Sequence, residues 1–331
     1  MNSTWEDAVQ QDADFWFEDG NIVLIANRTA FRVHQGVLSR HSEVLRSLFI
    51  LGQPVDEETM FGCPSVLLSD SPTDLQHLLR VLYDGSMSYF ERAKCLEFSE
   101  VAALVRLSHK YGIEPICRDG LARMRTIFTD DFSTWSDLRR STLDGVHSIC
   151  SPVLHLKAAE AIMAVSLARL TNSLTMLPVA LYICCLLQAR VLLQGATLSD
   201  GSSAQLSAED LQLCVRAIST LSTGHFAGIL RLWAQPSPQC SRGSTCANSL
   251  QKFVMRTSKH AKELTSVDVL GRSSDLIDVL VVEGRPCADC AVCMKSRGLE
   301  WSYRYWDDLP SISGFGDWSR LRDSTPASST S

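Results

Sequence analysis

The sequence lacks the short motifs that mark the common enzyme classes. It contains no P-loop, no nucleophile elbow of the G-x-S-x-G type, no H-E-x-x-H helix and no G-x-G-x-x-G after a strand. Its paired acids, Asp130-Asp131 and Asp307-Asp308, are adjacent in sequence, which favours helix-end or surface charges over an acid and base pair. We therefore predict that the protein is not an enzyme and has no catalytic residue and no organic cofactor.

Basic residues are also scarce, above all at the start of the chain. The first twenty residues include six acidic residues and no lysine or arginine, so they lack the basic start of a secretory signal. The formal charge of the whole chain is −6, whereas general binders of nucleic acids and anionic membranes usually carry a basic excess. We expect an intracellular protein, cytoplasmic or nuclear, for which nucleic acid is not the main partner.

A long uninterrupted apolar run is missing as well. The most apolar stretch, Leu170 to Ala189, is interrupted by Asn172, Pro178 and Gln188, which a lipid-facing helix rarely carries. The stretch therefore indicates buried helices rather than a membrane span, and we expect no membrane partner.

Cysteine, in contrast, is abundant, with twelve residues. Without a secretory signal, this number favours reduced thiols over a disulfide framework. Five of them lie inside apolar patterns and are predicted to be small core residues: Cys95, Cys117, Cys184, Cys185 and Cys214.

Strand and helix signals concentrate near the N-terminus. An apolar run at 22–25 and an alternating run at 31–33, separated by a short polar break, predict a β-hairpin. Residues 37–49 then repeat apolar side chains with the period of a helix. Further on, Ser71, Pro72 and Asp74 form a strong helix start with the features of a capping box.

This order of elements resembles the opening of a BTB/POZ domain. The residues that carry the resemblance are Asp19, Phe31, His34, Leu38, Ser42 and Phe49. Two positions depart from the family pattern, because Gln35 stands where a basic residue is usual and Leu45 where phenylalanine is usual. His34 has no neighbouring ligand or nucleophile, so we interpret it as a structural hydrogen-bonding residue.

Three stretches, FWFEDGNIVL, FRVHQGVLSRHSEV and LLRVLYDG, are similar to the large BTB group of basidiomycete fungi. Members of that group commonly end in a segment with tryptophan, leucine-proline and glycine after a cysteine pair, and a similar segment follows Trp301 here. We predict that its aromatic side chains cover the helical domain rather than form a ligand cage.

The expected fold class is α+β, with a small sheet capped by helices and then a mainly helical domain. The predicted organisation is an acidic disordered lead at 1–14, a BTB/POZ domain at 15–130, a helical C-terminal domain with a cysteine cluster at 131–322, and a disordered tail at 323–331. Strand signals become scarce after Asp130, which is why the second domain is expected to be helical.

The BTB resemblance implies protein partners. It implies dimerisation or partner recruitment, with some relatives serving as adaptors for cullin-based ubiquitin ligases or in transcriptional control. A dimer of the family type would use a surface that includes Phe15, Phe17, Leu45 and Leu48. In such a dimer Asp19 would face the neutral Gln35 instead of a basic residue, so either its buried carboxylate finds backbone donors or the usual dimer is weakened.

The cysteines near the C-terminus have the spacing of metal ligands. Cys240 and Cys246 form one pair, and Cys287 and Cys290 form a second pair two residues apart, the usual short chelating clip for zinc. Cys293 is an alternative ligand, since it repeats the same spacing from Cys290. The cluster therefore predicts one structural zinc ion, with unmetallated thiols as the other interpretation.

Two functions remain open from the sequence. The first is a non-enzymatic protein-interaction module. The alternative is a zinc-dependent nucleic-acid-binding protein built on the cysteine cluster, although residues 239–299 carry only nine lysines and arginines against six acids.

Overall fold

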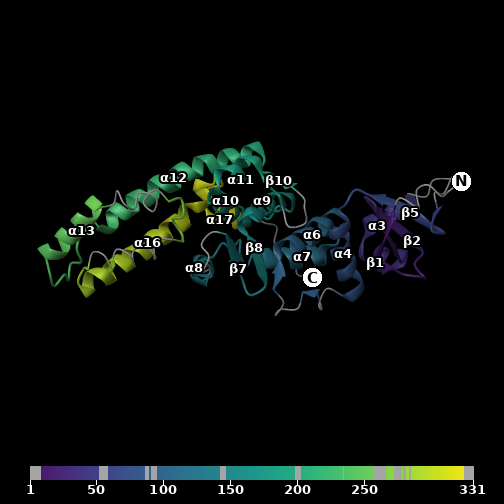
Figure 1. Ribbon diagram of the computed structural model, residues 1–331, viewed down its shortest axis with the longest axis horizontal. Helices are drawn as coiled ribbons and strands as arrows, with labels where there is room; N and C mark the ends of the chain where they lie inside the picture. The colour runs from purple at the N-terminus through teal and green to yellow at the C-terminus, as the bar shows by residue number, and fades with distance from the viewer. Residues whose placement is uncertain are drawn as a thin grey trace. The chain divides into compact units, whose positions relative to one another are not determined.

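The structure is a computed structural model (Figure 1). It describes residues 9–51, 59–85, 89–90, 95–141, 147–197, 203–233, 235–256, 266–271, 278, 281–282 and 285–323. The predicted tail at 323–331 therefore lies outside the described residues, apart from Asp323 at the end of the last helix. The chain divides into two compact units, one of residues 1–126 with 151–155 and one of residues 127–150 with 156–331.

The first unit is a mixed sheet with helices, and it confirms the predicted α+β class. Its elements are β1 (Gln10–Trp16), β2 (Ile22–Ala26), β3 (Thr29–Val33), α2 (Gln35–His41), α3 (Glu43–Leu51), β4 (Thr59–Met60), β5 (Cys63–Leu68), α4 (Pro72–Asp84), β6 (Leu96–Glu97), α6 (Phe98–Lys110) and α7 (Glu114–Met124). The five-stranded sheet has the order β1-β3-β2-β5-β4.

The predicted hairpin is present as β2 and β3. The two strands pair antiparallel from Ile22 opposite Val33 to Ala26 opposite Thr29, which leaves a two-residue loop. Asn27 in that loop has a φ of 52°, a left-handed conformation that asparagine tolerates better than most residues. The local turn chemistry thus fixes the register that buries Ile22, Leu24, Phe31 and Val33.

The N-terminal strand β1 corrects the prediction of a disordered lead at 1–14. Residues 10–14 belong to β1, which pairs in parallel with β3. The acidic side chains that suggested disorder have partners, because Asp12 accepts the backbone N–H groups of Asp14 and Phe15 and Asp14 pairs with Arg80 at 2.7 Å. Residues 1–8 of the predicted lead lie outside the described residues.

Helix α4 begins as predicted, with one difference in its cap. The side chain of Ser71 accepts the backbone N–H of Asp74, and Pro72 is the first helical residue. Asp74, expected to complete a capping box, is buried and forms an ion pair with Arg106 of α6 instead. This pair joins two helices that pack on each other, so the carboxylate serves tertiary packing.

A short return of the chain completes the first unit. Leu96 and Glu97 of β6 pair in parallel with Leu154 and His155. The backbone carbonyl of Val153 accepts the N–H of Leu96 at 3.1 Å and the guanidinium of Arg123 at 2.7 Å. Ser151–His155 therefore supplies hydrogen-bond partners that residues 9–130 alone do not contain.

The second unit is mainly helical. Its described elements are α8 (Phe132–Ser141), β7 (Ser148–Cys150), the end of β8 (Leu154–Lys157), η1 (Ala158–Glu160), α9 (Ala161–Leu170), η2 (Leu174–Met176), α10 (Leu177–Cys185), α11 (Ala189–Gln194), β9 (Ala196–Thr197), β10 (Ser203–Ala204), α12 (Ala208–Trp233), α13 (Ser244–Arg256), α16 (Ala288–Ile312) and α17 (Trp318–Asp323). Every residue of α10 is buried, and α9 and α12 pack against it.

A network of aromatic and charged side chains lies in the core of this unit. Trp306 of α16 stacks between Trp135 and Trp318, with ring centroids 6.1 and 5.4 Å away. Asp268 is buried, accepts the hydroxyl of Tyr182 at 2.7 Å and pairs with Arg139 at 2.7 Å. The aromatic residues near the C-terminus therefore cover the helical unit, as predicted from the sequence.

The long helices α12 and α16 run antiparallel and side by side (Figure 1). Two glycines of α12 face aromatic residues of α16. A Cβ atom at Gly228 would lie 2.0 Å from ring atoms of Trp301, and one at Gly224 would lie 2.0 Å from the hydroxyl of Tyr305. The ring of Trp301 is also held by His225, which stacks on it at 5.7 Å. The two helices can approach this closely only because these positions carry no side chain.

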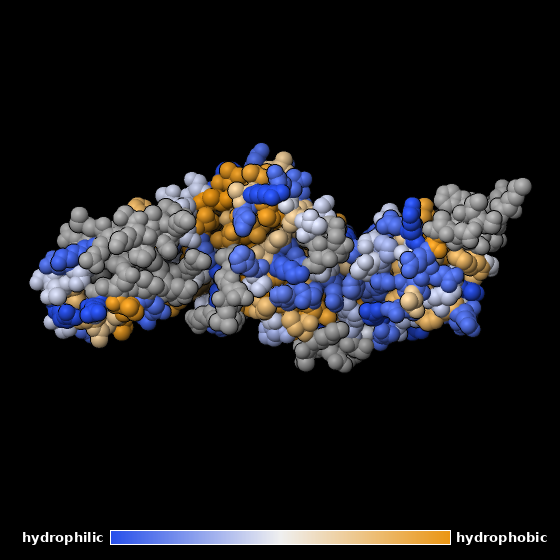
Figure 2. All heavy atoms as spheres, viewed as in Figure 1, coloured by the Kyte–Doolittle hydropathy of each residue, from blue (hydrophilic) through white to orange (hydrophobic). Residues whose placement is uncertain are grey.

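Among the described residues, α12 is the one helix long and apolar enough, by length and composition, to cross a membrane, a test that helices of soluble cores also pass. Apolar side chains gather on the face over α10 and α11 in Figure 2. The apolar run at 170–189 forms no single helix, because α9 ends at Leu170 and α10 begins at Leu177.

The return segment yields a prediction about the limits of the first unit. A fragment of residues 9–157 should be more stable than one of residues 9–130 by roughly 2–4 kcal/mol, because the shorter fragment leaves several hydrogen-bonding groups without partners. Urea unfolding followed by circular dichroism measures the difference. A fragment of residues 9–150, longer but still without the return segment, should behave like the short one. Equal stability of all three would contradict the role of Ser151–His155.

The glycine contacts between α12 and α16 yield a second prediction. Gly228→Ala should lower the free energy of unfolding of the second unit by roughly 1–3 kcal/mol, because the added methyl group would collide with the ring of Trp301, against which His225 stacks. Gly36→Ala is the matched control, since a Cβ there meets nothing within 4 Å and alanine favours the helix. Hydrogen exchange of α12 and α16 in the full chain reports the change. Unaltered protection in Gly228→Ala would mean that the helices are not in close contact there.

Candidate metal centre and interaction domain

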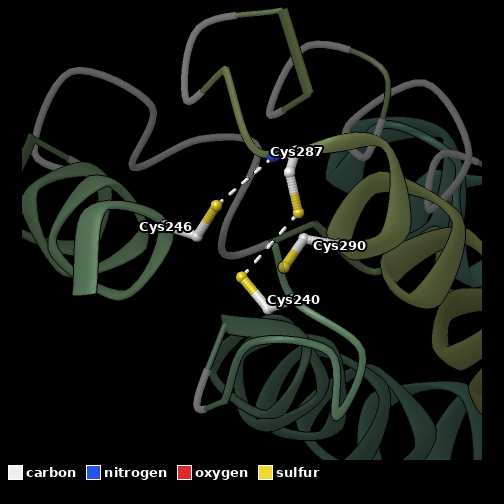
Figure 3. A group of neighbouring side chains, drawn as sticks. All are labelled: Cys240, Cys246, Cys287 and Cys290. Atoms are coloured by element: carbon white, nitrogen blue, oxygen red, sulfur yellow. Dashed lines mark hydrogen bonds between the residues drawn. The ribbon is translucent and has the colours of Figure 1, made fainter. Parts of the chain in front are cut away.

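Four cysteines from three elements of the second unit converge on one point. Cys240 lies in the turn after α12, Cys246 in the first turn of α13, Cys287 directly before α16 and Cys290 in its first turn. All four sulfur atoms lie within 4.8 Å of one another. Figure 3 shows the side chains pointing toward a common centre.

The local sequence explains why each cysteine faces this centre. Cys240 ends a turn in which its N–H donates to the carbonyl of Ser237, and Gly243 has a φ of 42° just before α13 begins. Cys287 is the N-cap of α16, and Cys290 is the third residue of that helix. Residues three apart lie on one face of a helix, so both thiols of this pair point the same way.

Backbone N–H groups stabilise negative charge on the sulfur atoms. The N–H of Cys287 donates to the sulfur of Cys246, and the N–H of Ser237 donates to the sulfur of Cys290, both at 3.3 Å. The sulfur atoms of Cys287 and Cys240 are 3.7 Å apart. Donors of this kind are typical of sites in which thiolates hold a cation.

Three of the cluster's thiols, those of Cys246, Cys287 and Cys290, have shifted pKa values. The backbone N–H of Cys290 lowers the pKa of the Cys287 thiol, because it donates to the thiolate. Burial raises the pKa of the Cys246 and Cys290 thiols.

The structure groups Cys290 with Cys287 and leaves Cys293 outside the cluster. Cys293 lies six residues, about one and two-thirds helical turns, beyond Cys287, so it faces another direction. Within the described part of the chain, no histidine or carboxylate joins these four ligand atoms. The site is composed of sulfur alone, which suits a soft cation with tetrahedral preference.

The BTB signature residues form the framework of the first unit. Phe31, Leu38 and Phe49 are buried in its core. Ser42 donates its hydroxyl to the carbonyl of Tyr111 at 2.6 Å and accepts the N–H of Leu45. These contacts tie α3 to the end of α6.

His34 connects the hairpin to α4. Its backbone N–H donates to the hydroxyl of Tyr83 at 2.8 Å, and its Nδ1 lies 3.0 Å from the same hydroxyl. Its Nε2 lies 3.2 Å from the carboxylate of Asp19. Phe17 stacks on Tyr83 with ring centroids 5.0 Å apart. The geometry agrees with the structural role predicted for His34.

The residues predicted to form a dimer surface separate into two groups. Phe15 and Leu45 are buried within one chain, at 5% and 3% exposure, so they belong to the core and not to an exposed surface. Phe17 and Leu48 are half-buried. Asp19 is largely exposed within one chain, and its carboxylate lies beside the ring of His34.

Comparison with known families identifies the first unit. Residues 17–120 match the BTB/POZ domain, a stretch of under a third of the chain. No curated protein matches the chain. The N-terminal unit is therefore a BTB/POZ fold, a class of protein-interaction module, with a helical region after it. The narrower resemblance to the basidiomycete group stays a prediction.

Two features of the second unit are not among those predicted from the sequence. The spacing of Gly224 and Gly228 was a signal for close helix packing that could have been found, since small residues four apart share one helix face. The buried set of Arg139, Tyr182 and Asp268 carries no such signal, because its members lie far apart in the chain.

Proposed function

We propose that the protein is a non-enzymatic interaction module in which the BTB/POZ unit binds a second copy of the chain and recruits other proteins. The observation that carries this proposal is the family match at residues 17–120 on a unit with the corresponding sheet and helices. The chemistry of the cysteine cluster agrees with it. Four sulfur ligands would fill a tetrahedral coordination sphere and leave no open position for a reacting water molecule.

The surface proposed for the dimer is the exposed face of α3. Val44 is 47% exposed and Leu48, one turn further, is half-buried beside it. Apolar side chains on adjacent turns of a surface helix are typical of a helix that packs against a partner. Phe17, half-buried on the stack with Tyr83, remains part of the proposed surface, whereas Phe15 and Leu45 are buried within one chain and are not part of it.

The chain should form a dimer that depends on this face. Val44→Glu should weaken self-association at least tenfold, because symmetry would place two charges in one apolar contact. Leu67→Glu is the control, since Leu67 is 76% exposed on β5 of the same unit and lies outside the proposed face. Light scattering at high micromolar concentration measures the mass. A monomer in the unaltered protein would contradict the dimer, and equal behaviour of both variants would place the contact elsewhere.

The finer proposal is that the recruited partner is a cullin scaffold, and the protein would then act in the cytoplasm or nucleus as a ligase adaptor. A role in transcriptional control would also need a protein partner. The purified chain should bind the N-terminal region of a cullin in isothermal titration calorimetry. Absence of heat with every cullin tested would remove the adaptor role.

Binding to duplex DNA distinguishes the proposed interaction module from a zinc-dependent nucleic-acid-binding protein. An interaction module should show no affinity for DNA that falls steeply as salt rises. Fluorescence anisotropy across a salt series measures this directly. A steep salt dependence that is lost when the cysteine cluster is mutated would favour a zinc-dependent nucleic-acid-binding protein instead.

A further inference from the structure

We propose that Cys240, Cys246, Cys287 and Cys290 bind one zinc ion as a four-thiolate structural site, and that this ion holds together the ends of α12, α13 and α16. The inference concerns the helical unit and is independent of the dimer and of the recruited partner. Its basis is the meeting of three chain segments at one cluster of sulfur atoms.

The distances fit a zinc tetrahedron with little movement. A Zn–S bond of about 2.3 Å places the sulfur atoms of a regular tetrahedron ~3.8 Å apart. The sulfur atoms of Cys240 and Cys287 already have this separation, at 3.7 Å, and every other pair lies within 4.8 Å. Changes of about 1 Å or less would complete the coordination sphere, which side-chain rotation can supply.

The surroundings offset the charge that such a site would carry. Four thiolates and one Zn²⁺ leave a net charge of −2. The N–H groups of Cys287 and Ser237 already point at two of the sulfur atoms. Cys246 and Cys290 also lie in the first turns of α13 and α16, where the helix dipoles favour negative charge.

The ligand set selects the metal. Magnesium and calcium need oxygen ligands, and none takes part here among the described residues. Tetrahedral sulfur favours zinc or iron, and the paired clip of Cys287 and Cys290 is the usual zinc arrangement. All four thiols are free in the structure, so no disulfide competes for them.

The ion would join parts of the chain that lie far apart in the sequence. Cys246 and Cys287 are 41 residues apart in sequence. Near the cluster, the guanidinium of Arg242 also donates to the carbonyl of Arg285 at 3.2 Å. A metal that joins ligands so far apart in the sequence restricts the unfolded chain and thereby stabilises the folded one.

Metal analysis of the full chain tests the proposal directly. The purified protein, prepared in reductant without added metal, should contain about one zinc per chain by mass spectrometry of the elements. Cys240→Ser and Cys290→Ser should each remove it. Cys293→Ser is the matched control, because it changes the next cysteine on the same helix and should keep the full zinc content. Cys63→Ser, in the first unit, should keep it as well.

A measurement on the unaltered protein tests the zinc site even if the cysteine variants fail to fold. A mercurial reagent that blocks thiols should release one zinc ion per chain to a chromogenic dye. Chelator should then raise hydrogen exchange in α13 and the first turns of α16 and leave α6 and α7 unchanged. Replacement by Co²⁺ should give the strong visible absorption of tetrahedral thiolate coordination.

Four results would overturn the proposal. These are iron instead of zinc, a disulfide between members of the cluster in protein kept reduced, full zinc content in Cys240→Ser, and absence of metal together with hydrogen exchange that ignores chelator. None of these would affect the BTB unit or its dimer, so a failure here is distinguishable from a failure of the proposed function.

Discussion

The close approach of α12 and α16 determines the arrangement of the second unit. Gly224 and Gly228 remove the side chains that would keep the helices apart, and the rings of Tyr305 and Trp301 occupy the space. Because both helices are long and antiparallel, a contact in their middle also brings the end of one near the start of the other. At one end the turn after α12 meets the start of α16, where the cysteines lie. Toward the other end of α16, Trp306 enters the aromatic core.

The parts of the fold that could be predicted from the sequence depend on residues close together in the chain. The hairpin follows from two runs of apolar residues and a turn that accepts a left-handed asparagine. The start of α4 follows from Ser71 and Pro72, which act on their own backbone. The cysteine cluster could be predicted for a related reason, since ligand spacing within each pair is a local property. Which of Cys290 and Cys293 joins Cys287 could not be predicted from spacing, because it depends on the side of α16 on which each side chain lies.

The parts that could not be predicted depend on contacts between distant segments. The acidic start of the chain suggests disorder until β3 and Arg80 supply partners for β1. The carboxylate of Asp74 has the position of a capping residue, but Arg106 is a stronger partner once α6 packs against α4. Asp268 is 129 residues from Arg139, so no local pattern could connect them. In each case tertiary contact overrides the local preference.

The apolar composition of α12 connects the metal centre to the rate at which the protein is degraded in the cell. This helix is, by length and composition, long and apolar enough to cross a membrane, and α16 packs along it. If the cysteines hold zinc as proposed, loss of the ion would let the start of α16 separate from the end of α12. The uncovered apolar surface is the feature that chaperones and proteases recognise in damaged proteins. A shortage of zinc would then raise the rate at which the protein is degraded and lower its steady-state amount, without any change in the BTB unit itself.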